Sequence, residues 1–312
     1  MKIIHAKQAL IGSKWLLDVQ VNISDDGRIA QIGDQTQTAT NKVAILLPAP
    51  LNLHSHTFQR AMSGLTEARG PDPRDSFWSW RQLMYRFLDQ LTPDHVEAIA
   101  SLAFMEMAEA GYASVAEFHY LHHDVAGKTY GNLAEMSDRI IAAAGNAGIG
   151  LTLLPVLYQY GGCDLRPLAG GQMRFDNDPA QFMRLHDGAA KSVRGAAADF
   201  NIGVAPHSLR AVDENGLAQI VDFAKSGPIH MHLAEQVAEV DELVAHRNAR
   251  PTEWLLANHD VNERWCLIHA TQLNDQETHD LAKSGAVAGL CPITESNRGD
   301  GIFRGTDFQD HG

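Results

Sequence analysis

The sequence has few cysteines, no cluster of positive charge and no long hydrophobic run. Its cysteines, Cys163, Cys266 and Cys291, lie far apart and form no C-x-x-C pair. This spacing argues against a thiolate zinc site or a disulfide framework and favours a reducing cytosol. Acidic residues outnumber basic ones by 38 to 25, which gives a net charge of −13. Because such a surface repels phosphate backbones and anionic lipid, we expect no nucleic-acid partner and no membrane association.

Targeting and membrane-spanning patterns are also missing. The first ten residues, MKIIHAKQAL, lack the apolar core of a signal peptide. No apolar run approaches the ~18 residues that a membrane span needs. The 312 residues suffice for a large core, and 45% apolar with 20% charged residues is a globular composition. We therefore predict a cytoplasmic globular protein.

Two regions differ in their hydrophobic pattern. Residues 1–47 contain short alternating segments, and WLLDVQVNISDDGRIAQIG predicts a β-hairpin that turns at SDDG, within a partial β-sandwich domain. Residues 48–312 alternate apolar segments with helical stretches. One such stretch is TPDHVEAIASLAFMEMAEAG, where Thr92 suits the N-terminal cap and Gly111 the C-terminal stop. Residues 159–179 show no periodicity and predict a long loop, either a lid or a plain insertion.

Seven apolar segments recur in the larger region: VAILLPAPLNL, YASVAEFHY, GIGLTLLPVLY, FNIGVAPHS, PIHMHLAE, WCLIHAT and GAVAGLCPI. Continuously apolar strands that alternate with helices are typical of a parallel sheet covered on both faces. Most of these segments end in polar residues, and the C-terminal strand ends of a β/α barrel form its active-site face. A doubly wound sheet would usually carry G-x-G-x-x-G after its first strand, and this motif is absent. We predict an α/β fold, a (β/α)8 TIM-like barrel with about seven strands present and the eighth missing.

The stretch LNLHSHTFQR places His54 and His56 on the same side of a strand. Alone, such a pair is more often a solvated loop or two hydrogen-bonded core histidines than a metal site. The barrel, however, brings His232, at the end of a later strand, to the same mouth. Three neutral imidazoles are a natural Zn²⁺ set that leaves a position open for water, so we predict one Zn²⁺ ion at these residues. His230, deeper in its strand, is better interpreted as a packed core histidine.

Two further strand-end residues suit hydrolytic chemistry. A bound metal lowers the pKa of its water from 15.7 to roughly 7, but attack on an unsaturated carbon still needs a proton carrier. Glu235, three residues after His232, fits that role, although a solvated carboxylate in the first turn of a helix would give the same spacing. His269 could polarise the electrophile or orient the water, or be an ordinary barrel histidine.

These motifs resemble the mononuclear deaminase branch of the amidohydrolase superfamily. Over essentially the whole chain, HSHTFQRAMSGLTE, FWSWRQLMYRF, EFHYLHH, APHSLRAV, HMHLAEQ and LCPITESNRGDGIF are similar to the formimidoylglutamate deiminase family. The resemblance implies a zinc-dependent barrel with a flanking β-domain, which hydrolyses N-formimidoyl-L-glutamate to N-formyl-L-glutamate and ammonia. It implies His54, His56 and His232 as ligands, Glu235 as proton shuttle and His269 as electrophilic helper. The substrate-holding residues that it implies are Gln59, Arg81, Tyr120, His207 and Arg210.

A glutamyl substrate carries two carboxylates, which call for cationic partners in an otherwise acidic protein. Arg81 in WSWRQ and Arg210 in PHSLR could supply them, whereas surface salt bridges are the alternative interpretation for both. The expected partner is a small dicarboxylate, and a homodimer is compatible with the sequence. Two alternatives remain open: a guanine-type or other cyclic amidine deaminase, and an inactive, truncated metal-binding fragment.

The resemblance is incomplete near the end of the sequence. The superfamily pattern continues into an eighth strand ending in an aspartate, usually within G-S-D, and no such segment follows TDFQDHG. Asp300 and Asp307 align with the loop and helix after the seventh strand, so neither replaces that ligand. Ser296 and Arg298 also depart from the expected residues. We therefore expect a fragment of a longer gene product.

Overall fold

The structure is a computed structural model that describes residues 2–34, 38–65 and 77–312, without the side chains of residues 77–79, 81 and 82. The chain divides after Pro50 into two compact units, and each is described here by itself.

The first unit is a four-stranded sheet with the order β3-β2-β1-β4. Its strands are β1 (Lys2–Ile11), β2 (Lys14–Ile23), β3 (Ile29–Asp34) and β4 (Asn41–Leu46). Strands β2 and β3 pair antiparallel, which confirms the predicted hairpin, and β4 pairs parallel to β1. At the hairpin turn Gly27 adopts a φ of 81°, a conformation that side chains with a Cβ rarely take. The buried core of this sheet is small, with two alanines and two valines: Ala6, Ala9, Val19 and Val21.

The strands described in the second unit all pair in parallel. They are β5 (Leu51–Ser55), β6 (Ser114–His119), β7 (Gly150–Leu157), β8 (Phe200–Ile202), β9 (Ala205–Pro206), β10 (Ile229–Leu233), β11 (Trp265–His269) and β12 (Val287–Gly289). They form the runs β5-β6-β7-β8, with β9 also on β7, and β10-β11-β12, and a parallel bridge between Val204 and Ile229 joins the two runs. Each of the seven predicted segments supplies strand residues, and the barrel is not closed among the described residues.

The first predicted strand segment is divided. VAILLPAPLNL contributes its beginning to β4 in the first unit and its end to β5 in the second. Pro48 and Pro50 lie between them. Because proline has no N–H to donate to a strand partner, the pairing of β4 ends before these residues.

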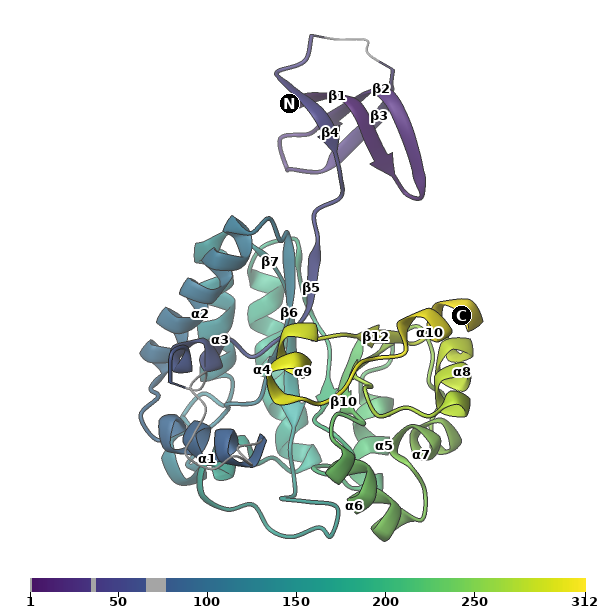
Figure 1. Cartoon of the computed structure of the whole chain (residues 1–312). Helices are drawn as coiled ribbons and strands as arrows, with labels where there is room; N and C mark the ends of the chain where they lie inside the picture. The colour runs from purple at the N-terminus through teal and green to yellow at the C-terminus, as the bar shows by residue number, and fades with distance from the viewer. Residues whose placement is uncertain (1, 35–37, 66–76) are drawn as a thin grey trace. The chain divides into compact units, whose positions relative to one another are not determined.

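Most of the helices lie around the parallel strands, whereas α9 passes in front of them in the view of Figure 1. The α-helices are α1 (Phe77–Leu88), α2 (Pro93–Glu109), α3 (Glu135–Ala147), α4 (Pro179–Gly195), α5 (Glu214–Phe223), α6 (Val237–Arg247), α7 (Pro251–Asn258), α8 (Asp275–Ser284), α9 (Pro292–Arg298) and α10 (Gly305–His311), and the 3₁₀ turns are η1 (Thr57–Met62), η2 (Val125–Gly127) and η3 (Gly170–Phe175). The predicted caps of α2 are present: the Thr92 side chain accepts from the N–H of His95, and Gly111 follows the helix with a φ of 94°. Neighbouring helices contact one another in chain order from α2 to α5 and from α6 to α8.

The predicted loop at residues 159–179 contains η3 and is anchored by a buried arginine. The guanidinium of Arg174 donates to the carbonyls of His123 and Leu91, both at 2.8 Å, and to that of Leu88. These bonds fasten the loop to the end of α1, to the residues just after it and to the segment that follows β6. Because one side chain supplies donors to three main-chain carbonyls, Arg174 organises this edge of the barrel unit.

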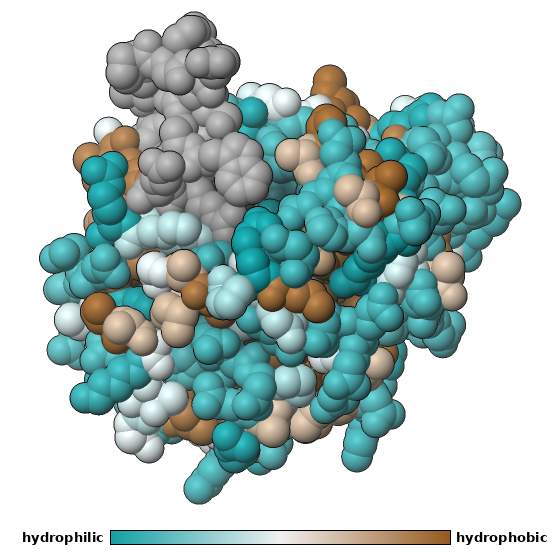
Figure 2. Space-filling model, turned by 90° about the horizontal axis from the view of Figure 1, so that it is seen from below, coloured by the Kyte–Doolittle hydropathy of each residue, from teal (hydrophilic) through white to brown (hydrophobic). Residues whose placement is uncertain are grey.

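The face of the molecule seen in Figure 2 is predominantly hydrophilic, and its hydrophobic side chains lie in small separate groups. Among the helices of the described residues, none is long and apolar enough to span a bilayer.

Candidate active site

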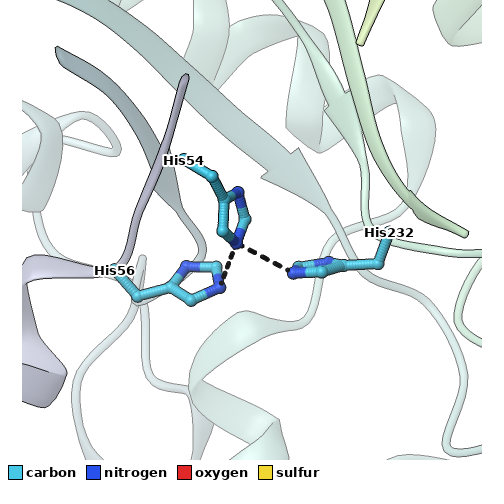
Figure 3. A group of neighbouring side chains, drawn as sticks. All are labelled: His54, His56 and His232. Atoms are coloured by element: carbon cyan, nitrogen blue, oxygen red, sulfur yellow. Dashed lines mark hydrogen bonds between the residues drawn. The ribbon is translucent and has the colours of Figure 1, made fainter. Parts of the chain in front are cut away.

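Three histidines from two distant strands converge at one point (Figure 3). His54 lies on β5 and His56 just after it, while His232 lies on β10. The Nε2 atom of His54 lies 3.1 Å from that of His56 and 3.2 Å from that of His232. The barrel therefore brings together residues that are 178 positions apart in the sequence.

The hydrogen bonds of the outer ring nitrogens fix how two of these imidazoles are protonated. The Nδ1 atom of His56 lies 2.9 Å from the carbonyl oxygen of Phe118, and that of His232 lies 3.2 Å from the carbonyl oxygen of His207. A carbonyl can only accept, so each Nδ1 donates and each Nε2 presents a lone pair to the centre.

The three histidines cannot satisfy one another by hydrogen bonds alone. His54 can donate through Nε2 to one neighbour but not to both, and its Nδ1 is buried with no partner in the described parts of the chain. Around a tetrahedral ion with Zn–N distances of 2.0–2.1 Å, ligand nitrogens lie about 3.3 Å apart, close to the observed separations. The chemistry of this donor set fits a metal ion.

Burial keeps the three imidazoles neutral, as metal ligands must be. It lowers the pKa of His56 to about 4. Burial, reinforced by the neighbouring histidines, also holds the pKa values of His54 and His232 well below the ordinary value. His230 is buried outside the cavity described below, as predicted for a packed core histidine.

Glu235 and His269 lie next to each other beside the histidines. His269 Nε2 is 3.5 Å from Glu235 Oε1, and His269 Nδ1 is 3.2 Å from Glu295 Oε1. Glu235 is only 3% exposed, so it is not a solvated helix carboxylate. Burial favours a higher pKa for Glu235, but His269, Arg298 and Arg210 outweigh it and leave that pKa below the ordinary value. Burial likewise opposes protonation of His269, but Glu235 and Glu295 raise its pKa.

One cavity, with about 700 Å³ of open space, joins these groups to most of the residues that the resemblance implies for the substrate. Gln59, Tyr120, His207 and Arg210 all line it. Gln59 Nε2 donates to the Tyr120 hydroxyl at 2.8 Å. The surface salt bridge considered for Arg210 is excluded, because this side chain is largely buried and its Nε lies 3.9 Å from the buried Glu239. The side chain of Arg81 lies outside the described residues.

The structure adds cavity residues that sequence reasoning did not assign to the site, among them Trp80, Phe175, Cys291 and Arg298. They lie in helices or loops without a polar strand end, so periodicity gives no signal for them. Cys291 forms a second group of potential ligands with His54 and His269. Burial raises the pKa of its thiol to about 12, which makes it a poor ligand compared with the three imidazoles.

Residues 45–306 match the amidohydrolase family, and the chain belongs to this family of metal-dependent hydrolases acting on C–N bonds. Residues 1–40 match the N-terminal domain of formimidoylglutamate deiminase HutF. Formimidoylglutamate deiminase from Pseudomonas aeruginosa is 46% identical over 311 residues, which are 99% of this chain and 68% of that protein. The resemblance to formimidoylglutamate deiminases is thus confirmed.

Solved structures agree on the fold. A crystal structure of an amidohydrolase from Brucella melitensis superposes with a TM-score of 0.95 at 47% identity, covering 100% of this chain and 69% of that one. An adenosine deaminase from Xanthomonas campestris with bound zinc gives a TM-score of 0.77 at 19% identity, covering 99% of this chain and 66% of that one. These likenesses confirm the predicted amidohydrolase barrel class.

Proposed function

We propose that the protein hydrolyses N-formimidoyl-L-glutamate to N-formyl-L-glutamate and ammonia, using one Zn²⁺ ion held by His54, His56 and His232. The observation that carries this proposal is a buried carboxylate–imidazole pair and a largely buried arginine in the same cavity as three neutral imidazoles. The identity to the Pseudomonas aeruginosa deiminase supports the same substrate. Zinc is supported by the all-nitrogen donor set and by the zinc-containing deaminase of the same fold.

Each side chain of the cavity has a separate role in the proposed hydrolysis. Bound zinc would supply Lewis acidity and an activated water for attack on the amidine carbon. Glu235, kept ionised by its neighbours, accepts the water's proton and returns it to the departing nitrogen. His269, flanked by two carboxylates, donates through Nε2 and orients the reacting groups. Arg210, together with Arg81, neutralises the substrate carboxylates.

The test uses zinc-loaded protein expressed from its complete reading frame. Formimidoylglutamate should release ammonia, and Glu235→Gln should lower kcat by roughly 10²–10⁴-fold because the proton carrier is lost. Absence of ammonia release from the zinc-loaded protein would refute the proposal.

A second variant tests the substrate class. Arg210→Met should raise KM for formimidoylglutamate, since one carboxylate loses its partner. The matched control is Arg304→Met, whose guanidinium pairs with Asp275 and Asp307 away from the cavity, and it should leave KM unchanged. If guanine or another cyclic amidine is the better substrate and is insensitive to Arg210→Met, the alternative deaminase is supported instead.

A further inference from the structure

Arg298 bridges two sides of the cavity. It is the last residue of α9, and its Nη1 donates to Glu235 Oε1 at 2.9 Å. The guanidinium carbon lies 4.2 Å from the centre of the Trp80 ring on α1, so the group stacks on an aromatic face. Its side chain is 19% exposed, whereas that of Glu235 is 4% exposed. The bridge therefore covers a buried carboxylate with a partly accessible cation.

A guanidinium is chemically close to the reacting group of the proposed substrate. Both guanidinium and amidinium are planar, delocalised cations with N–H donors in the plane, which suit a carboxylate partner and an aromatic face. In the proposed reaction Glu235 must transfer a proton to an amidine nitrogen, which brings that nitrogen within hydrogen-bond distance of its carboxylate. Arg298 Nη1 already lies within that distance of Oε1.

Displacing Arg298 has an energetic requirement. Glu235 is buried and ionised, and a buried charge is destabilised when it loses its closest cationic partner, here Arg298 at 2.9 Å. A cationic amidinium that enters would replace the lost positive charge, whereas a neutral cyclic amidine would leave the carboxylate with one positive neighbour fewer, since among the described cationic side chains only His269 and Arg210 would remain. The exchange therefore discriminates by charge as well as by shape.

We propose that Arg298 is a specificity-determining residue that occupies the amidinium subsite at Glu235 and yields it only to planar, cationic amidines. This inference rests on the proposed function through the role given to Glu235. It narrows the proposed substrate class to cationic amidines and gives the helix α9 a part in selection. It also accounts for Arg298, which departs from the residues that the family resemblance led us to expect.

The experiment measures binding of acetamidinium chloride, by isothermal titration calorimetry at constant ionic strength, to protein freed of metal with a chelator. Arg298→Met and Arg298→Gln should each bind this cation roughly tenfold more tightly than the unchanged protein, since a charge-assisted hydrogen bond no longer competes. Adding Glu235→Gln to either variant should abolish the gain. Acetamide, a neutral analogue of similar shape, should bind the Arg298 variants no more tightly than the unchanged protein.

Two controls separate occupation of the subsite from general effects. Arg210→Met removes a charge from the same cavity without uncovering Glu235, so its gain should be much smaller than that of Arg298→Met. Thermal unfolding followed by circular dichroism identifies a variant that does not fold. If one Arg298 variant does not fold, the acetamidinium affinity of the other one tests the inference. Equal acetamidinium affinity in the unchanged protein and in a folded Arg298 variant overturns the inference, as does an equal gain for acetamide.

The result of the acetamidinium experiment can be distinguished from that of the ammonia assay, which tests the proposed function. Acetamidinium binding needs neither metal nor turnover, so a failed ammonia assay leaves the binding comparison readable. Conversely, ammonia release without any change in acetamidinium affinity on substitution of Arg298 refutes this inference alone.

Discussion

Glu117 offers a quantitative test of how burial sets the chemistry around the site. It lies on β6 and is buried, and its Oε1 accepts from both the N–H and the hydroxyl of Thr57 at 2.7 Å. These bonds fix the start of η1, directly after His56. Burial nevertheless raises the pKa of the Glu117 carboxyl from 4.5 to about 7, because the two hydrogen bonds from Thr57 do not offset the lost hydration.

The perturbation is Glu117→Gln, which keeps an oxygen acceptor but does not titrate. Between pH 4.5 and about 7 the folded protein holds a proton on Glu117 that the unfolded chain has released, so its free energy of unfolding falls as the pH rises. The pKa difference corresponds to roughly 3 kcal/mol. The advantage of the unchanged protein over Glu117→Gln should therefore decrease by about this amount across the interval.

Urea unfolding at a series of pH values, followed by circular dichroism, measures this difference. The contributions of the other titrating groups to the pH dependence cancel in this difference, because both proteins contain those groups. The control is Glu106→Gln, because Glu106 is an exposed carboxyl whose pKa the Arg60 guanidinium lowers. The difference in free energy of unfolding between the unchanged protein and Glu106→Gln should therefore change far less with pH, and in the opposite direction. A constant difference between the unchanged protein and Glu117→Gln would refute the reasoning.

Three further substitutions test separate parts of the barrel unit. His232→Ala should weaken zinc binding by more than the roughly 10–100-fold typical of losing a ligand's supporting partner, as measured by competition with a chromogenic chelator. Glu295→Gln should lower kcat/KM by roughly tenfold or more with little change in KM, because His269 loses a charge-assisted hydrogen bond; an unchanged kcat would contradict this role. Arg174→Met should lower the free energy of unfolding by about 3 kcal/mol, measured by urea midpoint, since three buried carbonyls each lose a charged donor.

Much of the barrel was predictable because its strands and helices are local in sequence. Period-two spacing placed His54 and His56 on one side of a strand, and the alternation of apolar segments with helices implied that strand ends converge. Once convergence is assumed, His232 follows from its place at the end of β10. The sequence therefore sufficed to predict which three histidines meet.

Other features depend on contacts that no local pattern encodes. The division of the first strand segment between two sheets depends on how β1 and β5 pair with their neighbours, as well as on the prolines between them. The sequence pattern around Arg174 indicates only an arginine in a loop, although its hydrogen-bond partners lie 51 to 86 residues away. The pairing of Arg298 with Glu235, 63 residues apart, likewise appears only when α9 is placed beside the segment that follows β10.

The main-chain oxygens that orient two of the central imidazoles have an evolutionary consequence. They belong to Phe118 and His207, yet every amino acid carries the same carbonyl. Replacing either side chain leaves the acceptor in place as long as the strand keeps its path. The orientation of His56 and His232 therefore depends on main-chain acceptors, which a side-chain substitution does not remove. Substitution of His207, which lines the cavity, can change the contacts offered to a substrate while the acceptor for His232 stays in place.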